Sequence, residues 1–289
     1  MRFAVIGGDM RIASLAQRLY LRGDAVRCFA LERADLPPEL CVPSLTEAVR
    51  SAECVILPLP TAGRRGFLNA PLANAEHRMD TVLAALSPET LVCAGRVDSE
   101  TERAARARGI ELIDYFQREE LAVGNAVATA EGAVSLIMQD TAITLWRSRV
   151  LVIGYGRVGK LTADRLRAMG AEVWCSARKC GDRAWIEAFG MHALDTRALS
   201  GELRRFDVVV NTVPAPILTE SLLRELRPDT LCIDLASRPG GMDFAAAGAL
   251  GLRAVWALSL PGEVAPISAG GMILDTIRNI VKERHEWKN

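Results

Sequence analysis

The chain has 289 residues, half of them hydrophobic, and its 35 Lys and Arg balance its 35 Asp and Glu. This length suggests two domains, and zero net charge gives no reason to expect nucleic acid or an anionic membrane as a partner. Seven Cys without a closely spaced pair, and three His without metal-ligand spacing, predict no metal site. Buried thiols and a strand in place of a signal peptide at 2–6 predict a reducing, cytoplasmic location.

Strand and helix patterns alternate along the first part of the chain. Helical patterns lie between short apolar runs, notably at 10–22, which ends at Gly23, and at 99–108, which ends at Gly109. This alternation predicts an α/β domain over 1–118, a doubly wound parallel sheet with helices on both faces. The expected strands are 2–6, 25–29, 53–57, 90–94 and 110–113.

Polar residues of this first domain follow the predicted strands. In the first strand–helix turn, Gly7-Gly-Asp9-Met-Arg11, the helix N-terminus and Arg11 would attract an anion. Asp9 is placed there for proton transfer or for capping the helix. The turn is not a GxGxxG loop, so we expect no second dinucleotide here. Thr61, in the loop 58–63 after the third strand, is a candidate substrate ligand.

The apolar stretch 119–146 predicts a long helix that joins two domains. Glu131 and Asp140 interrupt it, so we expect no membrane span. Asn125 is a further candidate substrate ligand, and Glu131 is a second candidate base beside Asp9. The charges at 117–120 are either part of the site or a solvated cluster.

The stretch 154–159, Gly-Tyr-Gly-Arg-Val-Gly, lies between an apolar run, 149–153, and a helical pattern that ends at Gly170. In this strand–turn–helix context the glycines let backbone amides approach a pyrophosphate, which the helix N-terminus attracts. A merely structural tight turn is the alternative. The candidate cofactor-binding residues here are Gly154, Gly156, Arg157, Val158 and Gly159.

The next predicted strand indicates which dinucleotide binds. NAD-binding domains usually carry Asp or Glu about 20 residues on, to hold the ribose 2′-hydroxyl. Here the run 172–176 ends at Ser176 without an acid, and Arg178 and Lys179 follow. A hydroxyl and two cations suit a 2′-phosphate, so we expect NADP, with NAD as the alternative if the turn is only a solvated basic one.

The second alternating set fits a Rossmann domain over 119–268, and a final helix within 269–289 could pack back on the first domain. Ligands of such sheets bind beyond the C-terminal strand ends, so we expect the active site in the cleft between the domains. The expected strands are 149–153, 171–175, 191–194, 207–212, 230–235 and 253–257.

Two loops of this second domain carry further candidates. The segment 211–216 follows the fourth strand, where chains of this fold run past the nicotinamide ribose, or it is only a proline-rich turn. Its candidates are Thr212, Val213 and Pro214. In the loop 234–241, Arg238 could grip a carboxylate with two parallel hydrogen bonds, or it is an ordinary surface Arg.

Five motifs occur in order along the chain, at 7–11, 125–132, 154–159, 234–241 and 260–270. Together they resemble the family of the A subunit of dipicolinate synthase, an enzyme of spore-forming bacteria, and the resemblance covers essentially the whole chain. The wider fold is similar to D-2-hydroxyacid and alanine dehydrogenases. One departure is Ile267, where the family often carries Lys.

The resemblance implies oxidation of dihydrodipicolinate, or of its hydrated precursor, to pyridine-2,6-dicarboxylate with NADP⁺ as hydride acceptor. It also implies that the partner is a flavoprotein-like B subunit of the synthase, and that the chain acts in the mother cell during sporulation. A homo-oligomer is a reasonable default. A dianionic substrate requires cations, for which Arg238 and Arg11 are the candidates, and ring oxidation requires a base, either Asp9 or Glu131.

Two other functions stay open. A D-2-hydroxyacid dehydrogenase would use a His after the last Rossmann strand, and 256–263 contains none; an alanine-dehydrogenase-like reaction is harder to separate. A non-catalytic dinucleotide-sensing protein is the other alternative, because a fold never proves catalysis.

Overall fold

The computed structural model describes residues 1–286 of the chain, which form two compact units. Unit 1 consists of Met1–Asn125 and of the chain from Ala265 onward, and unit 2 of Ala126–Val264. The sequence predicts domain limits at 118 and 268. The expected final helix extends over 269–289, of which 287–289 lie outside the described residues.

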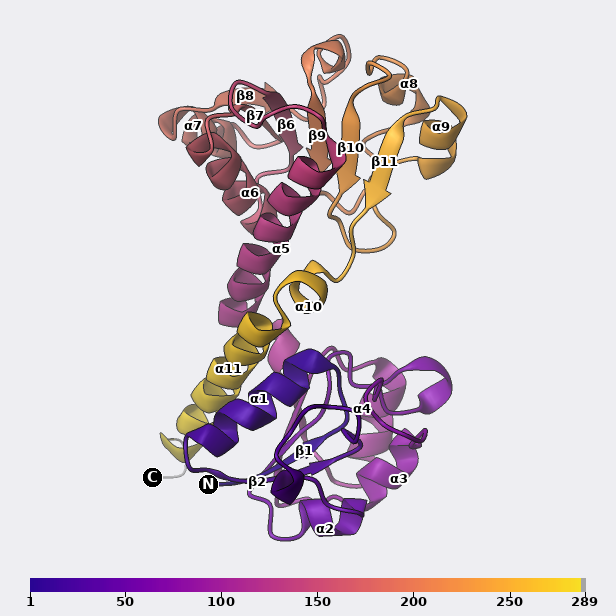
Figure 1. Ribbon diagram of the computed structural model, residues 1–289, viewed down its shortest axis with the longest axis vertical. Coiled ribbons are helices and arrows are strands. Elements are labelled where there is room, and N and C mark those ends of the chain that lie inside the picture. The colour runs from indigo at the N-terminus through magenta and orange to yellow at the C-terminus, as the bar shows by residue number, and fades with distance from the viewer. Residues whose placement is uncertain (287–289) are drawn as a thin grey trace. The chain divides into compact units, whose positions relative to one another are not determined.

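The sheet of unit 1 has five parallel strands in the order β2-β1-β3-β4-β5, which is a flavodoxin-like order. Strands β1 and β2 are labelled in Figure 1. Phe3 and Val5 of β1 pack on one side of it, with Ile12 and Leu15, and Ala4 packs on the other. The strands are β1 (Arg2–Ile6), β2 (Ala25–Phe29), β3 (Cys54–Ile56), β4 (Leu91–Ala94) and β5 (Leu112–Asp114). The helices before α5 are α1 (Met10–Leu21), α2 (Leu45–Val49), α3 (Met79–Ala84) and α4 (Ser99–Arg106), with short 3₁₀ turns η1 (Pro38–Leu40), η2 (Arg64–Gly66) and η3 (Tyr115–Gln117).

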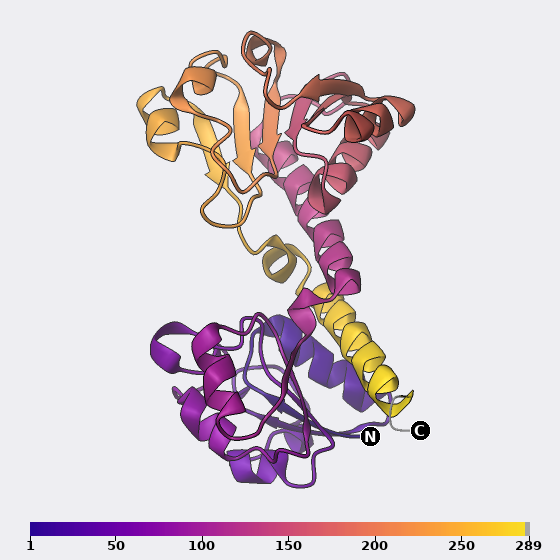
Figure 2. The ribbon, with the colours of Figure 1, turned by 180° about the vertical axis from the view of Figure 1, so that it is seen from behind.

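The last helix, α11 (Pro266–Glu286), lies along α1, as both views show (Figure 2). A Cβ on Gly270 would lie 2.3 Å from the Arg11 carbonyl oxygen, so only glycine permits this close approach. Ile273 and Ile277 are fully buried in the same cluster as Leu15 of α1. Each such buried side chain stabilises the unit by roughly 1.5–3 kcal/mol.

Helix α5 (Glu119–Asp140) has 22 residues and ends six residues before the predicted limit of 146. Its end is fixed by side chains: Arg253 donates hydrogen bonds to the carbonyl and carboxylate of Asp140, and the Thr141 hydroxyl donates to the Ile137 carbonyl at 2.7 Å. By length and composition α5 is apolar enough to cross a membrane. Leu121 and Ile137 of α5 are fully buried, in the cores of unit 1 and unit 2 respectively.

The sheet of unit 2 has six parallel strands in the order β11-β10-β9-β6-β7-β8, the doubly wound order of a Rossmann domain. The prediction of two doubly wound parallel-sheet domains, the second a Rossmann domain, is therefore confirmed. Its strands are β6 (Arg149–Ile153), β7 (Glu172–Ala177), β8 (His192–Asp195), β9 (Val208–Asn211), β10 (Leu231–Asp234) and β11 (Arg253–Trp256). Its helices after α5 are α6 (Arg157–Ala168), α7 (Cys180–Ala188), α8 (Glu220–Leu223), α9 (Phe244–Ala249) and α10 (Leu260–Val264), with the 3₁₀ turn η4 (Leu203–Arg205).

Candidate functional site

The glycine cluster of unit 2 forms the turn between β6 and α6. Gly154 has φ +97°, and a Cβ there would lie 2.5 Å from the Thr212 hydroxyl. A Cβ on Gly159 would lie 2.1 Å from the Gly154 carbonyl oxygen, so this glycine lets α6 pack against the strand end. A Cβ on Gly156, in contrast, would meet no atom within 4 Å. Close packing within the protein thus requires glycine at 154 and 159, whereas Gly156 borders open space.

That open space lies at the start of a helix. Gly156 is the N-cap of α6, no side chain caps it, and the first turn, which includes Arg157 and Val158, carries no acidic residue. The positive end of the helix dipole therefore faces the space beside Gly156, and no acidic side chain of the first turn of α6 neutralises it. This geometry fits a pyrophosphate group.

A cavity of about 360 Å³ continues from this turn, entirely within unit 2. Seven of the predicted cofactor-binding residues line it: Gly154, Gly156, Arg178, Lys179, Thr212, Val213 and Pro214. Other residues that line it are Tyr155, Ala177, Asp182, Thr196, Ala215 and Ile217. The strand ends thus bring together residues that are up to about sixty positions apart in the sequence.

Ser176 lies behind the wall of this cavity and not on it. The side chain is fully buried on β7, and its hydroxyl accepts a 3.1 Å hydrogen bond from the Thr196 hydroxyl. Thr196, directly after β8, lines the cavity in its place. Sequence reasoning missed Thr196 because only the pairing of β7 with β8 brings it beside Ser176.

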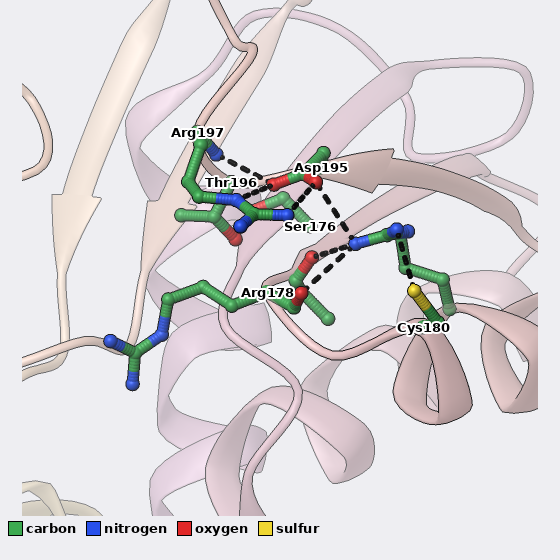
Figure 3. Close-up of polar contacts among 8 residues, drawn as sticks. Ser176, Arg178, Cys180, Asp195, Thr196 and Arg197 are labelled. Carbon is green, nitrogen blue, oxygen red and sulfur yellow. Dashed lines mark hydrogen bonds and ion pairs between the residues drawn. The ribbon is translucent and has the colours of Figure 1, made fainter.

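A carboxylate next to Thr196 organises the loop that carries the predicted cations (Figure 3). Asp195 pairs with Arg197 at 2.6 Å and with Arg183 at 3.1 Å. Hydrogen bonds from Arg197, and the charges of both guanidinium groups, hold the pKa of the Asp195 carboxyl far below its usual range. The Arg178 side chain, in contrast, extends away from this cluster (Figure 3) and is exposed.

One buried carboxylate, that of Asp234, binds the backbone of the loop 234–241. Asp234 accepts hydrogen bonds from the Ala236 and Gly241 backbone amides at 3.0 and 2.7 Å. Arg238, in the middle of this loop, is exposed, and its guanidinium carbon lies 5.6 Å from the centre of the Trp256 ring. A rigid loop therefore presents a cation that carries no carboxylate partner within the described residues.

In unit 1, the two candidates at the first turn bind each other. Asp9 caps α1, accepting from the Arg11 backbone amide at 3.0 Å. The Arg11 guanidinium donates back to this carboxylate, with Nη2 at 2.7 Å, and to the Leu59 carbonyl oxygen. The two side chains, expected to act separately as a base and as a cation, are thus paired with each other in this structure. Arg11 is buried enough, with 14% of its side chain exposed, to act as a brace between the turn and the loop at Leu59.

The remaining candidates of the sequence analysis are Thr61, in the loop 58–63, and Asn125 and Glu131, both on α5. Thr61 is fully buried, and its hydroxyl donates to the Gly95 carbonyl oxygen at 2.9 Å and accepts from the Gly95 amide, so it holds the loop 58–63 in place. Asn125 is half-buried on α5. Glu131, also on α5, is exposed and pairs with Arg165 of α6 at 3.3 Å. Among the described residues, no group of three or more His, Cys, Asp or Glu side chains is placed to hold a metal ion.

Comparison with known proteins accounts for both units. Residues 2–116 match the N-terminal domain of the dipicolinate synthase A subunit, and residues 125–236 match the D-isomer specific 2-hydroxyacid dehydrogenase, NAD binding domain. The dipicolinate synthase A subunit of Bacillus subtilis (strain 168) is 29% identical over 286 residues, which are 98% of this chain and 96% of the relative. Over nearly its whole length the chain is similar to the dipicolinate synthase A subunit.

Solved structures show the same similarity. The crystal structure of dipicolinate synthase, A chain, from Bacillus subtilis has a TM-score of 0.88 and covers 98% of this chain and 96% of its own. The dipicolinate synthase A subunit from Bacillus halodurans, 27% identical, has the same TM-score and covers 96% and 97% of the two chains. D-lactate dehydrogenase from Escherichia coli, at 13% identity and a TM-score of 0.65 over 99% and 98% of the chains, shares the fold alone.

The part of the chain that matches an NAD-binding domain, residues 125–236, therefore falls almost entirely in unit 2. It includes the turn at Gly154–Gly159 and all the residues that line the cavity beside it. The chain is thus of the NAD(P)-dependent oxidoreductase type.

Proposed function

We propose that this chain oxidises dihydrodipicolinate, or its 4-hydroxytetrahydro precursor, to dipicolinate, with NADP⁺ as the hydride acceptor. The relationship to the dipicolinate synthase A subunit over nearly the whole chain carries this proposal, together with the dinucleotide cavity of unit 2. When it is bound, the nicotinamide accepts the hydride that leaves the substrate ring.

The preference for NADP over NAD rests on the cations of the cavity. Arg178 and Lys179 are exposed at its wall, where β7 ends without an acidic residue. Asp182 is the acidic side chain of the lining, so positive charge remains in excess there. Thr196, rather than Ser176, is the hydroxyl residue that lines the cavity, and its hydroxyl would have to turn away from Ser176 to donate to a 2′-phosphate.

The substrate is a dianion, and two Arg residues support its binding. Arg238 is exposed on a loop that Asp234 makes rigid, which favours a bidentate hold on one ring carboxylate. Arg11 is already paired with Asp9 and bound to the Leu59 carbonyl oxygen. It would therefore bind the substrate only through the donors of its guanidinium that these two contacts leave over. Thr61 supports the neighbouring loop, and Asn125 is a candidate for a neutral contact.

Loss of hydride and formation of the aromatic ring also require removal of a proton. Asp9 is the stronger candidate for this base, because it lies at the carboxyl edge of a parallel sheet, where ligands of this fold bind. Glu131 lies in the middle of α5 and is paired with Arg165 on α6. Since aromatisation supplies driving force, we expect the protein to contribute mostly orientation.

We propose further that the chain acts in the cytoplasm, in the mother cell during sporulation, and with a second polypeptide of the synthase, the flavoprotein-like B subunit. The relative's name, which designates one lettered subunit of the synthase, supports the partner. A homo-oligomer remains our expectation.

The test is a turnover assay with freshly generated dihydrodipicolinate precursor and NADP⁺, with NADPH and dipicolinate followed together. The purified chain is assayed alone and with the candidate partner. Both products rising in step would support the proposal. Binding of NADPH with no product, even with the partner present, would instead favour a dinucleotide-sensing protein. Turnover of pyruvate with ammonia would favour an alanine-dehydrogenase-type enzyme.

A further inference from the structure

We propose that Asp195 is a positioning residue for the adenosine 2′-phosphate: through Arg183 it fixes the backbone from which Arg178 and Lys179 reach the phosphate. The inference rests on the NADP preference proposed above and is independent of which substrate is oxidised. Asp195 is the last residue of β8, one strand beyond the one whose end usually decides between NAD and NADP.

The contacts form a chain from Asp195 to the loop (Figure 3). Arg183 Nη1 lies 3.1 Å from the Asp195 carboxylate and also donates, at 3.1 Å each, to the carbonyl oxygens of Ala177 and Arg178. One guanidinium thus binds the strand end, the loop backbone and the carboxylate together. We call Asp195, Arg183 and these two carbonyl groups the clasp.

The clasp leaves the phosphate-binding side chains unused. The Arg178 side chain extends away from it (Figure 3), and Lys179, the N-cap of α7, makes no capping side-chain hydrogen bond. Because long cationic side chains lose entropy when a ligand immobilises them, a fixed backbone origin raises the affinity that they achieve.

A second connection ties the same strand end to the cavity. Thr196 follows Asp195 and lines the cavity, and its hydroxyl binds the buried Ser176 on β7. The ends of β7 and β8 are therefore joined twice, by the clasp and by this hydroxyl pair. Arg197 also pairs with Asp195, but no hydrogen bond of its guanidinium to the loop 177–180 occurs among the described residues.

The direction in which NADPH affinity changes when Asp195 loses its charge tests the clasp. Removing an acidic charge near a phosphate should strengthen NADPH binding if charge alone acts. Asp195→Asn should instead weaken NADPH binding, by about tenfold, because Arg183 loses its charged partner. Asp182→Asn removes an equal charge from the cavity wall, and among the described residues the Asp182 side chain makes no hydrogen bond or ion pair with Arg183. It is the matched control and should bind NADPH as well as or better than the wild type.

The measurement is fluorescence titration of the purified full chain with NADPH and with NADH, alongside thermal melts. Wild type should prefer NADPH, and Asp195→Asn and Arg183→Lys should each lose this preference while NADH affinity and Tm stay near wild type. Arg197→Ala should retain it.

Three results with the variants would overturn the proposal. These are tighter NADPH binding by Asp195→Asn, an equal loss of both dinucleotides, or a loss in Arg197→Ala as large as that in Asp195→Asn. A wild type that binds NADH as well as NADPH would also overturn it, and with it the NADP preference. If the assay above showed no turnover but the chain still preferred NADPH, the proposed reaction would be wrong. The proposed role of the clasp would be unaffected.

Discussion

Asn211 and Asp234 are paired in register on β9 and β10, and the Asn211 side-chain amide donates a 2.8 Å hydrogen bond to the Asp234 carboxylate. Both side chains are wholly buried. The same carboxylate accepts two backbone amides of the loop that carries Arg238. A buried polar pair thus determines the course of an exposed loop.

Asp234→Ala should therefore destabilise the protein strongly. The change removes one of the two acceptors of the Asn211 side-chain amide and the acceptor of two loop amides, at a cost of about 3 kcal/mol in the free energy of unfolding. Asp243→Ala is the matched control, because Asp243 caps α9 at the surface through one hydrogen bond to the Ala246 amide and should cost about 1 kcal/mol. Urea denaturation measures both values. Equal costs would show that the buried network contributes no more than a helix cap.

Alanine variants of two glycines in the turn should distinguish a position that the ligand needs from one that protein packing needs. Gly156→Ala meets no protein atom, so stability should be retained while dinucleotide affinity falls roughly 10- to 100-fold, the effect of about 1–3 kcal/mol of overpacking against the ligand. Gly159→Ala should lower Tm as well, since its Cβ would collide with the Gly154 carbonyl.

Gly248→Ala is the control for these glycine variants. It lies in α9 with open space around it, and it should leave binding unchanged and stabilise the protein by about 0.5–1 kcal/mol. NADPH titration and thermal melts are the measurements. If Gly156→Ala kept full dinucleotide affinity, the pyrophosphate would not bind at this turn.

The double variant Arg178→Ala with Lys179→Ala should weaken NADPH by roughly 100-fold, because two charge-assisted contacts are lost. NADH affinity should change little. The NADPH affinity of the wild type should also fall with added salt, and that of the variant much less so. Equal losses for both dinucleotides would refute the role of these cations at the 2′-phosphate.

Arg238→Ala should raise the KM for the dicarboxylate by roughly 10- to 100-fold, through loss of one charge-assisted pair. NADPH affinity should be unaffected. Arg224→Ala is the control, because Arg224 pairs with Glu220 at the surface of α8. Steady-state kinetics with each variant gives the answer, and unchanged kinetics in Arg238→Ala would exclude Arg238 from the site.

Asp9→Asn should lower kcat by about 100-fold if Asp9 is the base, and it keeps the shape of the side chain that binds Arg11. Glu131→Gln serves as the comparison and should leave kcat near wild type. Activity and Tm are measured together. A fall in Tm with normal kcat would reduce Asp9 to a helix cap and a partner of Arg11.

The sequence predicted the elements better than the side-chain contacts. The apolar runs at β1 and β6 and the glycines after β6 follow from period and spacing, since they depend on neighbours along the chain. The Asp195–Arg183 contact depends on how β8 pairs with β7, which no local pattern encodes.

Two other findings required side-chain geometry. Asp9 and Arg11, two residues apart, carry the signal of an N-cap, but their mutual pairing depends on rotamers and on the Leu59 carbonyl. The helix α5 ends at Asp140 because Arg253, more than a hundred residues later, binds there, although the apolar pattern continues to 146.

The packing of α11 on α1 has a consequence for synthesis on the ribosome. Unit 1 uses both ends of the chain, and unit 2 is made between them. While a nascent chain has reached only Val264, the face of α1 that includes Leu15 lacks its cover of Ile273 and Ile277. The first unit to emerge is therefore the last to be completed, and unit 2 has its whole sequence available to fold before unit 1 does.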